Sequence, residues 1–553
     1  MPLHLDRKKI TLLFVFVFAL FAANAQYHYF IFLKDKKNTA SYLADPSTFL
    51  SEKCIARRAK FNIPITIADV PVHAPYIDSL LSFSLEKKYT IKWMNMLYAT
   101  SSFDIKNKLA AISFVEKIIC YKEETTHNKK SKTEETFDCD FATADSYGAA
   151  ASQNKMIHIP TLHAMGYKGE GMLIAMMDVG FTDANTNPFF AKVYARNGVL
   201  KTMDVVDNEV NVYDNSSHGL SCWSTIAANK ENELVGTAPN ANFLLYRTEN
   251  DASETIVEEY NWAFAAEDAE NEGAQIFSTS LGYTTFDRDS MNHTLADLDG
   301  NTTVIAKAAN RAAGLGVLVV NSAGNEGNDP VWQGHISSPA DADSAMAVGA
   351  VDSNGVIADF SGRGFLNSLP IKPNVCAQGV KTAVVDAQGN VLRGNGTSFA
   401  CPIIAGAAAC LWQSMPNKTN FEIMQAIEKS SNYFFMPNVD YGNGIPNFYT
   451  AYQLLNNDLS EVALQQTNEQ LLIYQNPMAE KLQFIFFTKK NRALKINVAD
   501  IQGKTILSDN ACVNANEFLY YSSEKLSQLA RGTYILQIIE NNKLLNARKF
   551  LKN

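Results

Sequence analysis

Four polar residues in the middle of the 553-residue chain have the types and surroundings that enzyme chemistry would require. Asp178 ends one apolar run, and His218 leads through a glycine into an apolar helix rich in small residues. Asn325 lies in a glycine-containing loop after another apolar run, and Ser398 follows a Gly-Thr turn at the start of a second apolar helix. Functional groups of an open parallel sheet gather beyond the carboxyl ends of its strands, so we expect these side chains to converge there.

Together these side chains could carry out nucleophilic catalysis. The hydroxyl of Ser398 is a poor nucleophile unless a base such as His218 removes its proton. A carboxylate such as Asp178 can hold the imidazole in the required tautomer. The amide of Asn325 can donate to a developing oxyanion, and the electropositive helix start favours negative charge beside Ser398. We expect Pro402 in the first turn of that helix, where a missing N–H costs no hydrogen bond.

Each of these segments also has an ordinary structural explanation. Most aspartates in an Asp-x-Gly triplet after a strand lie in turns, and the loop around Asn325 can be a turn as well. A single histidine is more often structural than catalytic. The case for catalysis therefore rests on the four segments occurring together, in the chain order Asp, His, Asn, Ser.

Composition limits the class of protein. Hydrophobic residues make up 46% and charged residues 19% of the chain, which is ordinary for a folded globular protein and excludes a wholly disordered one. Lys and Arg number 48 against 57 Asp and Glu, a net charge of -9, so we expect no nucleic-acid partner. The eight cysteines are too few for a disulfide scaffold, and we expect no essential disulfide.

The elements that must position the four residues lie between 153 and 455. Short apolar runs alternate there with helical patterns, which predicts βαβ units and an α/β fold with a mostly parallel sheet flanked by helices. The runs that we expect to be strands are 172–177, 242–246, 275–278, 316–320 and 345–351.

Three further regions precede this α/β block. Residues 1–25 combine a basic start, about 13 apolar residues and a small-x-small cleavage site, which indicates a signal peptide; the alternative, a membrane anchor, needs roughly 20 apolar residues. Residues 26–121 predict a small αβ domain, followed by a polar linker or processing region over 122–152. Within the αβ domain we expect strands at 29–33, 92–98 and 118–121 and helices within 46–61 and 75–85.

The end of the chain has a different pattern. A polar linker over 456–469 precedes residues 470–553, where alternating strands and turn signals predict a small β-sandwich. The clearest strands are 482–486, 494–498 and 534–539.

The middle block resembles the subtilisin-like serine proteases, or subtilases. The residues that carry the resemblance are 172–180, 215–228, 276–282, 316–327, 339–351, 395–407 and 441–444. The resemblance implies a secreted serine endopeptidase that hydrolyses peptide bonds through an acyl-enzyme. It implies that Ser398 is the nucleophile, His218 the base and Asp178 the residue that orients the imidazole. The oxyanion donors would be the Asn325 side chain and the Ser398 N–H.

The resemblance also implies how a substrate binds. Ser280, Leu281 and Gly282 would pair with the substrate backbone as with an added strand, a mode that gives affinity with little sequence selectivity. Ala323 and Gly324 would be the other substrate-binding residues.

Two nearby residues and one pH effect complete this expectation. Reading back from Pro339 places Ser337 at the floor of a small polar, uncharged pocket. Cys222 matches a buried cysteine under the catalytic histidine of the proteinase K-like and thermitase-like branches, so we expect a structural thiol. Because the imidazole of His218 must be neutral to act as a base, we expect the rate to fall as it becomes protonated at low pH.

The flanking regions carry their own resemblances. Residues 26–121 resemble the inhibitory, ferredoxin-like αβ pro-segment of subtilases; an accessory domain is the alternative. Residues 470–553 resemble the type IX secretion sorting domain of Bacteroidota, through segments such as 474–477, 498–504 and 526–534; a generic binding module is the alternative. This domain implies passage through the periplasm, then release or attachment to the outer cell surface.

These resemblances imply the partners and cofactors. The partners would be protein or peptide substrates and the type IX secretion machinery, and we expect a monomer without a transmembrane segment in its mature form. No cofactor is required, and no His/Cys cluster has the spacing of a metal site. Structural calcium is common in subtilases and could be ligated by Asp297 and Asp299, with solvated acidic loops as the alternative. A catalytically inactive binding protein and a hydrolase of esters or small amides stay open as other functions.

Overall fold

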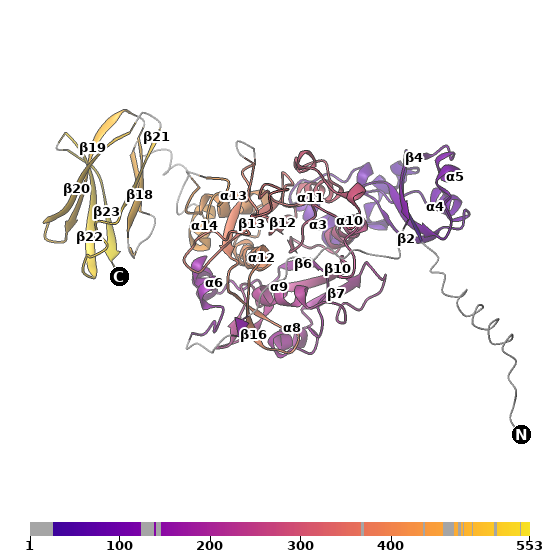
Figure 1. Ribbon diagram of the computed structural model, residues 1–553, viewed down its shortest axis with the longest axis horizontal. Helices are drawn as coiled ribbons and strands as arrows, with labels where there is room; N and C mark the ends of the chain where they lie inside the picture. Colours follow the sequence, from indigo (N-terminus) through magenta and orange to yellow (C-terminus); the bar gives the residue numbers. More distant parts are fainter. Residues whose placement is uncertain are drawn as a thin grey trace, which may run out of the picture. The chain divides into compact units, whose positions relative to one another are not determined.

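The computed structural model describes residues 26–122, 138–139, 145–365, 370–434, 437–456, 469–473, 477–478, 481–488, 490–513, 517–541 and 543–552. The chain forms two compact units, one up to Tyr452 and one from Gln453 onward (Figure 1). The signal peptide predicted over 1–25 and most of the linkers predicted over 122–152 and 456–469 lie outside the described residues. Within the described ranges, none of the helices has both the length and the apolar character that a membrane span requires.

The N-terminal part of the first unit is a four-stranded antiparallel sheet with helices on one face. Side chains of β1 alternate between the two faces: Tyr29 and Ile31 pack with the helices of this region, whereas Phe30 stacks on Tyr260 of the central block, with ring centroids 3.9 Å apart. The strand order is β2-β3-β1-β4, from β1 (Tyr27–Leu33), β2 (Glu86–Ile91), β3 (Met96–Ser101) and β4 (Val115–Lys122). The helices are α2 (Thr39–Ala44), α3 (Glu52–Lys60), α4 (Ala74–Leu81) and α5 (Lys106–Ala110).

The strand predicted over 92–98 is wrong at its beginning. β3 starts at Met96, and Asn95 has a left-handed φ of 48° in the turn that joins β2 to β3. Trp93 and Met94 are apolar because they pack against the core of the central block, not because they belong to a strand. An apolar run that covers another domain cannot be distinguished from a strand by its composition.

The central block contains the predicted parallel sheet. Its seven strands have the order β14-β13-β12-β11-β6-β10-β7, and every neighbouring pair is parallel. Each of the five strands predicted from apolar runs is present, with ends shifted by one or two residues. The strands are β6 (Leu173–Asp178), β7 (Val199–Asp204), β10 (Asn242–Arg247), β11 (Ile276–Thr279), β12 (Leu318–Ser322), β13 (Met346–Val351) and β14 (Val375–Gln378).

Helices cover this sheet. In β6, Leu173, Ala175 and Met177 pack in one core with α10 (Val257–Asn271) and α11 (Val304–Gly314). Because side chains alternate along a strand, Asp178 projects to the other face. There α9 (His218–Ala227) and α12 (Thr397–Ser414) pack against each other and against the sheet strands.

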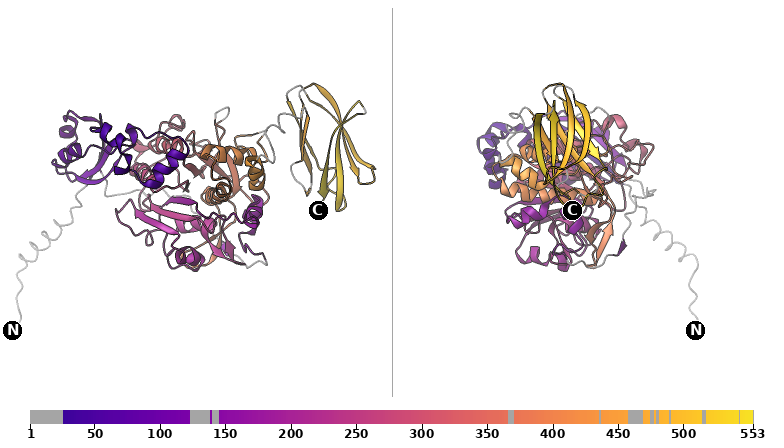
Figure 2. Two further views of the ribbon diagram at one scale, coloured as in Figure 1. Left: turned by 180° about the vertical axis from the view of Figure 1, so that it is seen from behind. Right: turned by 90° about the vertical axis from the view of Figure 1, so that its left-hand side faces the viewer.

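Shorter elements complete the block, and the N-terminal region lies against α10 (Figures 1 and 2). Residues 138–139, within the predicted linker, pair as β5 with β16. The remaining helices are α6 (Ala151–Met156), α7 (Ile159–Ala164), α8 (Ala191–Ala195), α13 (Asn420–Lys429) and α14 (Phe448–Leu455), and the remaining strands are β5 (Asp138–Cys139), β8 (Asn229–Lys230), β9 (Leu234–Val235), β15 (Thr382–Val385) and β16 (Val391–Gly394).

The second unit consists of two antiparallel sheets around one core. Leu482, Phe484 and Phe486 from one sheet pack with residues such as Ile496 and Leu536 from the other. The three strands predicted here lie within β18, β19 and β22. The sheets are β17-β18-β21 and β20-β19-β22-β23, formed by β17 (Glu469–Ile473), β18 (Leu482–Thr488), β19 (Arg492–Asp500), β20 (Thr505–Val513), β21 (Glu517–Ser523), β22 (Gly532–Glu540) and β23 (Lys543–Lys552).

Candidate functional site

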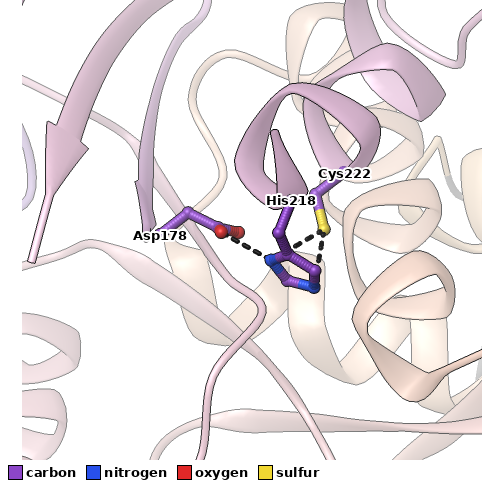
Figure 3. A group of neighbouring side chains, drawn as sticks. All are labelled: Asp178, His218 and Cys222. Carbon is purple, nitrogen blue, oxygen red and sulfur yellow. Dashed lines mark hydrogen bonds and ion pairs between the residues drawn. The ribbon is translucent and has the colours of Figure 1, made fainter. Parts of the chain in front are cut away.

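Asp178 and His218 form a hydrogen bond at the carboxyl end of the central sheet. The imidazole Nδ1 lies 2.6 Å from Asp178 Oδ1 (Figure 3). The N–H of Val179 donates to the same oxygen at 2.9 Å. Asp178 is only 1% exposed, and among the described residues its Oδ2 has no hydrogen-bond partner. The buried carboxylate thus holds one nitrogen, Nδ1, of a partly exposed imidazole.

A glycine permits this close approach of β6 and α9. A Cβ at Gly219 would lie 2.4 Å from the carbonyl oxygen of Gly180 and 2.9 Å from the Cβ of Asp178. Both distances are too short for any side chain. The glycine that follows His218 is therefore required for the helix to begin beside Asp178 and the loop that follows it.

Cys222 lies one turn after His218 and connects the imidazole to the Ser398 helix. Its Sγ is 3.9 Å from Nδ1 and 3.7 Å from Nε2 of His218 (Figure 3). The same Sγ is 3.4 Å from the carbonyl oxygen of Ser398. The rings of His218 and Phe399 are 6.2 Å apart. The structure therefore places the start of α12 beside the imidazole.

The same three residues also include ligand types for a metal. Among the described residues, Asp178, His218 and Cys222 have ligand atoms within 4.8 Å of one another. The 2.6 Å hydrogen bond commits one carboxylate oxygen and one imidazole nitrogen to each other. A metal bound at these atoms would have to break that bond.

Ser398 is the second residue of α12, and Pro402 is not in the first turn as expected. The helix begins at Thr397, which makes Pro402 its sixth residue. An N–H at position 402 would donate to the carbonyl of Ser398, and proline has none. That carbonyl instead accepts from the hydroxyl of Ser280 at 2.7 Å and from the thiol of Cys222 at 3.4 Å.

Asn325 is held by the residue before Ser398. Its Oδ1 accepts from the backbone N–H and from the hydroxyl of Thr397, each at 3.0 Å. Because the oxygen is used in this way, the two N–H groups of the amide are the part of Asn325 that is left to donate elsewhere.

The other predicted substrate residues lie directly after β11 and β12. Leu281 accepts at its carbonyl from Asn321 Nδ2 at 3.1 Å, and Ala323 accepts at its carbonyl from the N–H of Ser337 at 3.2 Å. A Cβ at Gly282 would lie 1.9 Å from Ser337 Oγ. Ser337 is therefore packed against the two segments that were expected to bind the substrate.

Glu326 is a residue of this region that the sequence reasoning did not single out. A Cβ at Gly324 would lie 2.5 Å from Glu326 Oε2 and 2.8 Å from Ser337 Oγ. Burial raises the pKa of the Glu326 carboxyl, and among the described residues its Oε2 has no hydrogen-bond partner. The surroundings of Ser337 thus hold a carboxyl group besides the small polar side chain that was expected. Its position directly after Asn325 is the feature of the sequence that could have identified Glu326 as a residue of the site.

The two aspartates considered for calcium are used in local turns. Asp297 accepts from the N–H and hydroxyl of Thr294 at 2.7 and 2.6 Å. Asp299 accepts from the N–H groups of Asn301 and Thr302 at 2.9 and 2.7 Å. These contacts lower the pKa of both carboxyls.

Three families match separate parts of the chain. The subtilase family matches residues 169–446, a little over half of the chain. The propeptide domain of S8 peptidases from Bacteroidota matches residues 28–136, and the secretion-system C-terminal sorting domain matches residues 472–553.

Curated relatives match the same central part. Subtilisin E of Bacillus subtilis (strain 168) is 29% identical over 317 residues, which cover 57% of this chain and 73% of the relative. The thermostable alkaline protease of Halalkalibacterium halodurans is 29% identical over 294 residues, covering 52% and 70%. The alkaline protease of Alkalihalobacillus alcalophilus is 30% identical over 302 residues, covering 53% and 68%.

Proposed function

The chain belongs to the subtilase family and is a serine-type endopeptidase, and we propose that Asp178, His218 and Ser398 are its catalytic triad. The chain is made as a zymogen with a propeptide, and its sorting domain marks it as secreted or attached to the cell surface. The single observation that best supports the triad is the 2.6 Å hydrogen bond between Asp178 and His218 beside the start of α12. The two alternatives considered from the sequence are a catalytically inactive binding protein and a hydrolase of esters or small amides. The labelling and degradation experiments described below distinguish them from a peptidase.

The proposed reaction starts with proton transfer from the serine. His218 Nε2 takes the proton of the Ser398 hydroxyl as Oγ attacks the carbonyl carbon of the scissile peptide bond. Asp178 holds the Nδ1–H tautomer and stabilises the imidazolium that forms. The imidazolium then protonates the leaving amine, the C–N bond breaks, and an ester between Ser398 and the substrate remains. Water attacks this ester with His218 again as base, which releases the carboxylic acid and restores the serine.

The negative charge that develops on the substrate oxygen needs donors. We assign this role to the side-chain N–H groups of Asn325 and to the backbone N–H of Ser398, which has no helical acceptor at the start of α12. The contact of Asn325 Oδ1 with Thr397 supports the assignment because it fixes the amide before the substrate arrives. Loss of one such donor typically lowers turnover by about 10²–10³-fold, which is the effect expected for Asn325→Ala.

The segments after β11 and β12 are the proposed substrate-binding residues, and the C-terminal domain is the proposed contact with a partner. We propose that Ser280, Leu281 and Gly282 on one side, and Ala323 and Gly324 on the other, bind an extended protein or peptide chain. All the groups in this chemistry come from the chain, so the reaction needs no cofactor. The type IX secretion machinery is the proposed partner of the C-terminal domain, and the mature enzyme is proposed to act as a monomer.

Labelling of the nucleophile tests the proposal directly. A serine-directed phosphonate should attach to Ser398 of the processed protein, and mass mapping would identify the modified residue. Ser398→Ala should abolish both labelling and the degradation of an unfolded protein substrate. Persistent degradation by Ser398→Ala would reject the triad. Hydrolysis of a small ester without any peptide cleavage would instead favour an esterase.

A further inference from the structure

The carbonyl group of Ser398 has an unusual environment for a helix. Pro402 removes the N–H that would otherwise donate to this oxygen, although α12 continues through Pro402 to Ser414. The carbonyl is buried, with Ser398 only 6% exposed. A buried carbonyl without a donor is costly, so another group has to supply one.

Two side chains from other elements supply that donor. The hydroxyl of Ser280, directly after β11, donates at 2.7 Å, which is the usual length of a well-formed hydrogen bond from an O–H donor. The thiol of Cys222 on α9 lies at 3.4 Å and is a weak donor. Ser280 is 6% exposed and Cys222 is fully buried. The hydroxyl is thus the main replacement for the missing helical N–H.

The contact of Ser280 is one of two that hold the backbone around Ser398. On the preceding side, Asn325 Oδ1 holds the N–H of Thr397 at 3.0 Å. On the following side, Ser280 holds the carbonyl of Ser398 itself. The Cα that carries the serine side chain lies between these two hydrogen bonds, which restrain the backbone from which its Oγ and its N–H project.

We propose that the Ser280 side chain is a positioning residue for the nucleophile, occupying the place that Pro402 leaves open in the helical hydrogen-bond pattern. This inference rests on the proposed role of Ser398. It differs from the substrate-binding role assigned to the 280–282 segment, which uses backbone groups. Removing the hydroxyl frees the Ser398 peptide to rotate, so the attacking oxygen and the oxyanion N–H lose their alignment while the binding cleft keeps its shape.

Restoring the helical donor tests this role. Ser280→Ala should lower kcat and the rate of phosphonate labelling by about tenfold, the usual scale for one hydrogen bond, with KM almost unchanged. Pro402→Ala gives residue 402 an N–H that can reach the same carbonyl. The double variant S280A/P402A should therefore recover most of the lost labelling rate. Ser280→Cys, which keeps the shape but donates weakly, should fall between the wild type and Ser280→Ala.

The outcomes separate this inference from the proposed function. If the wild-type protein is not labelled at Ser398, the proposed triad fails. If it is labelled but Ser280→Ala changes only KM, Ser280 contacts the substrate and the positioning role is wrong. A double variant no faster than Ser280→Ala would also overturn it. Thermal unfolding of each variant, measured in parallel, identifies any loss that comes from poor folding, and the labelling rate is then compared among the folded variants.

Discussion

Arg58 of the propeptide and Glu270 of α10 form a buried ion pair across the contact between the propeptide and the peptidase. Arg58 Nη2 lies 3.0 Å from Glu270 Oε2, and each side chain is 1% exposed. Asp69 lies 2.9 Å from Arg58 Nη1, and Arg57 contacts Glu270 as well. Burial alone would raise the pKa of Glu270, but the two arginines hold it below its usual range. The Glu270 carboxylate of the peptidase is thus kept charged by two arginines of the propeptide.

Removal of Glu270 should loosen the propeptide. Breaking a buried pair from one side typically costs about 3–5 kcal/mol, because the remaining charge stays buried without its partner. In a full-length Ser398→Ala chain, Glu270→Ala should speed amide hydrogen exchange in β1 and β3 by at least roughly a hundredfold. Exchange measured by mass spectrometry would show the change region by region.

A surface pair provides the control for this experiment. Glu422 lies on α13 and Lys418 lies just before that helix. Lys418 Nζ is 2.9 Å from Glu422 Oε1, and the side chains of Glu422 and Lys418 are 44% and 35% exposed. Glu422→Ala removes this exposed pair together with the capping contacts of Glu422 to Thr419, all of them local to α13, and should leave exchange in β1 and β3 unchanged. Equal exchange in the Glu270 and Glu422 variants would contradict a role of the buried pair.

Substitution of Gly219 should separate Asp178 from His218. A Cβ at this position would collide with the Gly180 carbonyl and with the Asp178 side chain, so α9 has to shift in Gly219→Ala. We expect kcat to fall by at least about a hundredfold, because small misplacements of catalytic groups have effects of this size. Gly314→Ala is the matched control, since a Cβ there meets nothing within 4 Å. Peptidase activity of Gly219→Ala within threefold of that control would contradict the required close contact.

The order of strands and functional segments could be predicted because it depends on local pattern. Buried parallel strands appear as continuous apolar runs, and the runs before Asp178 and Asn325 are strands of the central sheet. The apolar run at Trp93 was mistaken for part of a strand because the partner that buries it is far away in the sequence.

The finer features of the site could not be predicted, because they depend on contacts between distant residues. Nothing local shows that α12 starts at Thr397 and therefore places Pro402 in its second turn. The Ser280 contact that compensates for Pro402 joins residues that are 118 apart in the chain. The position of Glu326 beside Ser337 likewise depends on the packing of two loops.

Glu326 should favour substrates with a cationic side chain next to the scissile bond. Its carboxyl lies beside Gly324 and Ser337, where the floor of the specificity pocket is expected, and a positive charge brought there interacts through a medium that water screens poorly. Glu326→Gln should lower kcat/KM for a lysine substrate, relative to its methionine counterpart, by about tenfold. Because burial raises the pKa of Glu326, the preference should weaken as the pH falls. The control is Glu231→Gln, at an exposed position. If the ratio of kcat/KM for the lysine and methionine substrates is the same in Glu326→Gln as in this control, Glu326 does not contact the substrate side chain.

Asp341 should make the folded protein lose stability as the pH rises towards neutrality. It is 5% exposed, accepts from the N–H of Gly300 at 3.0 Å, and burial raises its pKa to about 6. A folded-state pKa above the unfolded value means that the folded form binds the proton more tightly. The resulting stability is fully present below about pH 4 and is lost as the pH rises through about 6.

Asp341→Asn keeps an acceptor for Gly300 and removes this titration. Between pH 4 and 7 the variant should therefore gain on the order of 3 kcal/mol of unfolding free energy relative to its parent, about 1.4 for each unit of the shift. Denaturant unfolding of the catalytic unit in the Ser398→Ala background, at both pH values, gives the difference. Asp251→Asn, a substitution at an exposed position, is the control. Its free energy of unfolding should change between pH 4 and 7 by the same amount as that of the parent. A stability difference between Asp341→Asn and its parent that stays constant with pH would show that Asp341 does not titrate in this range.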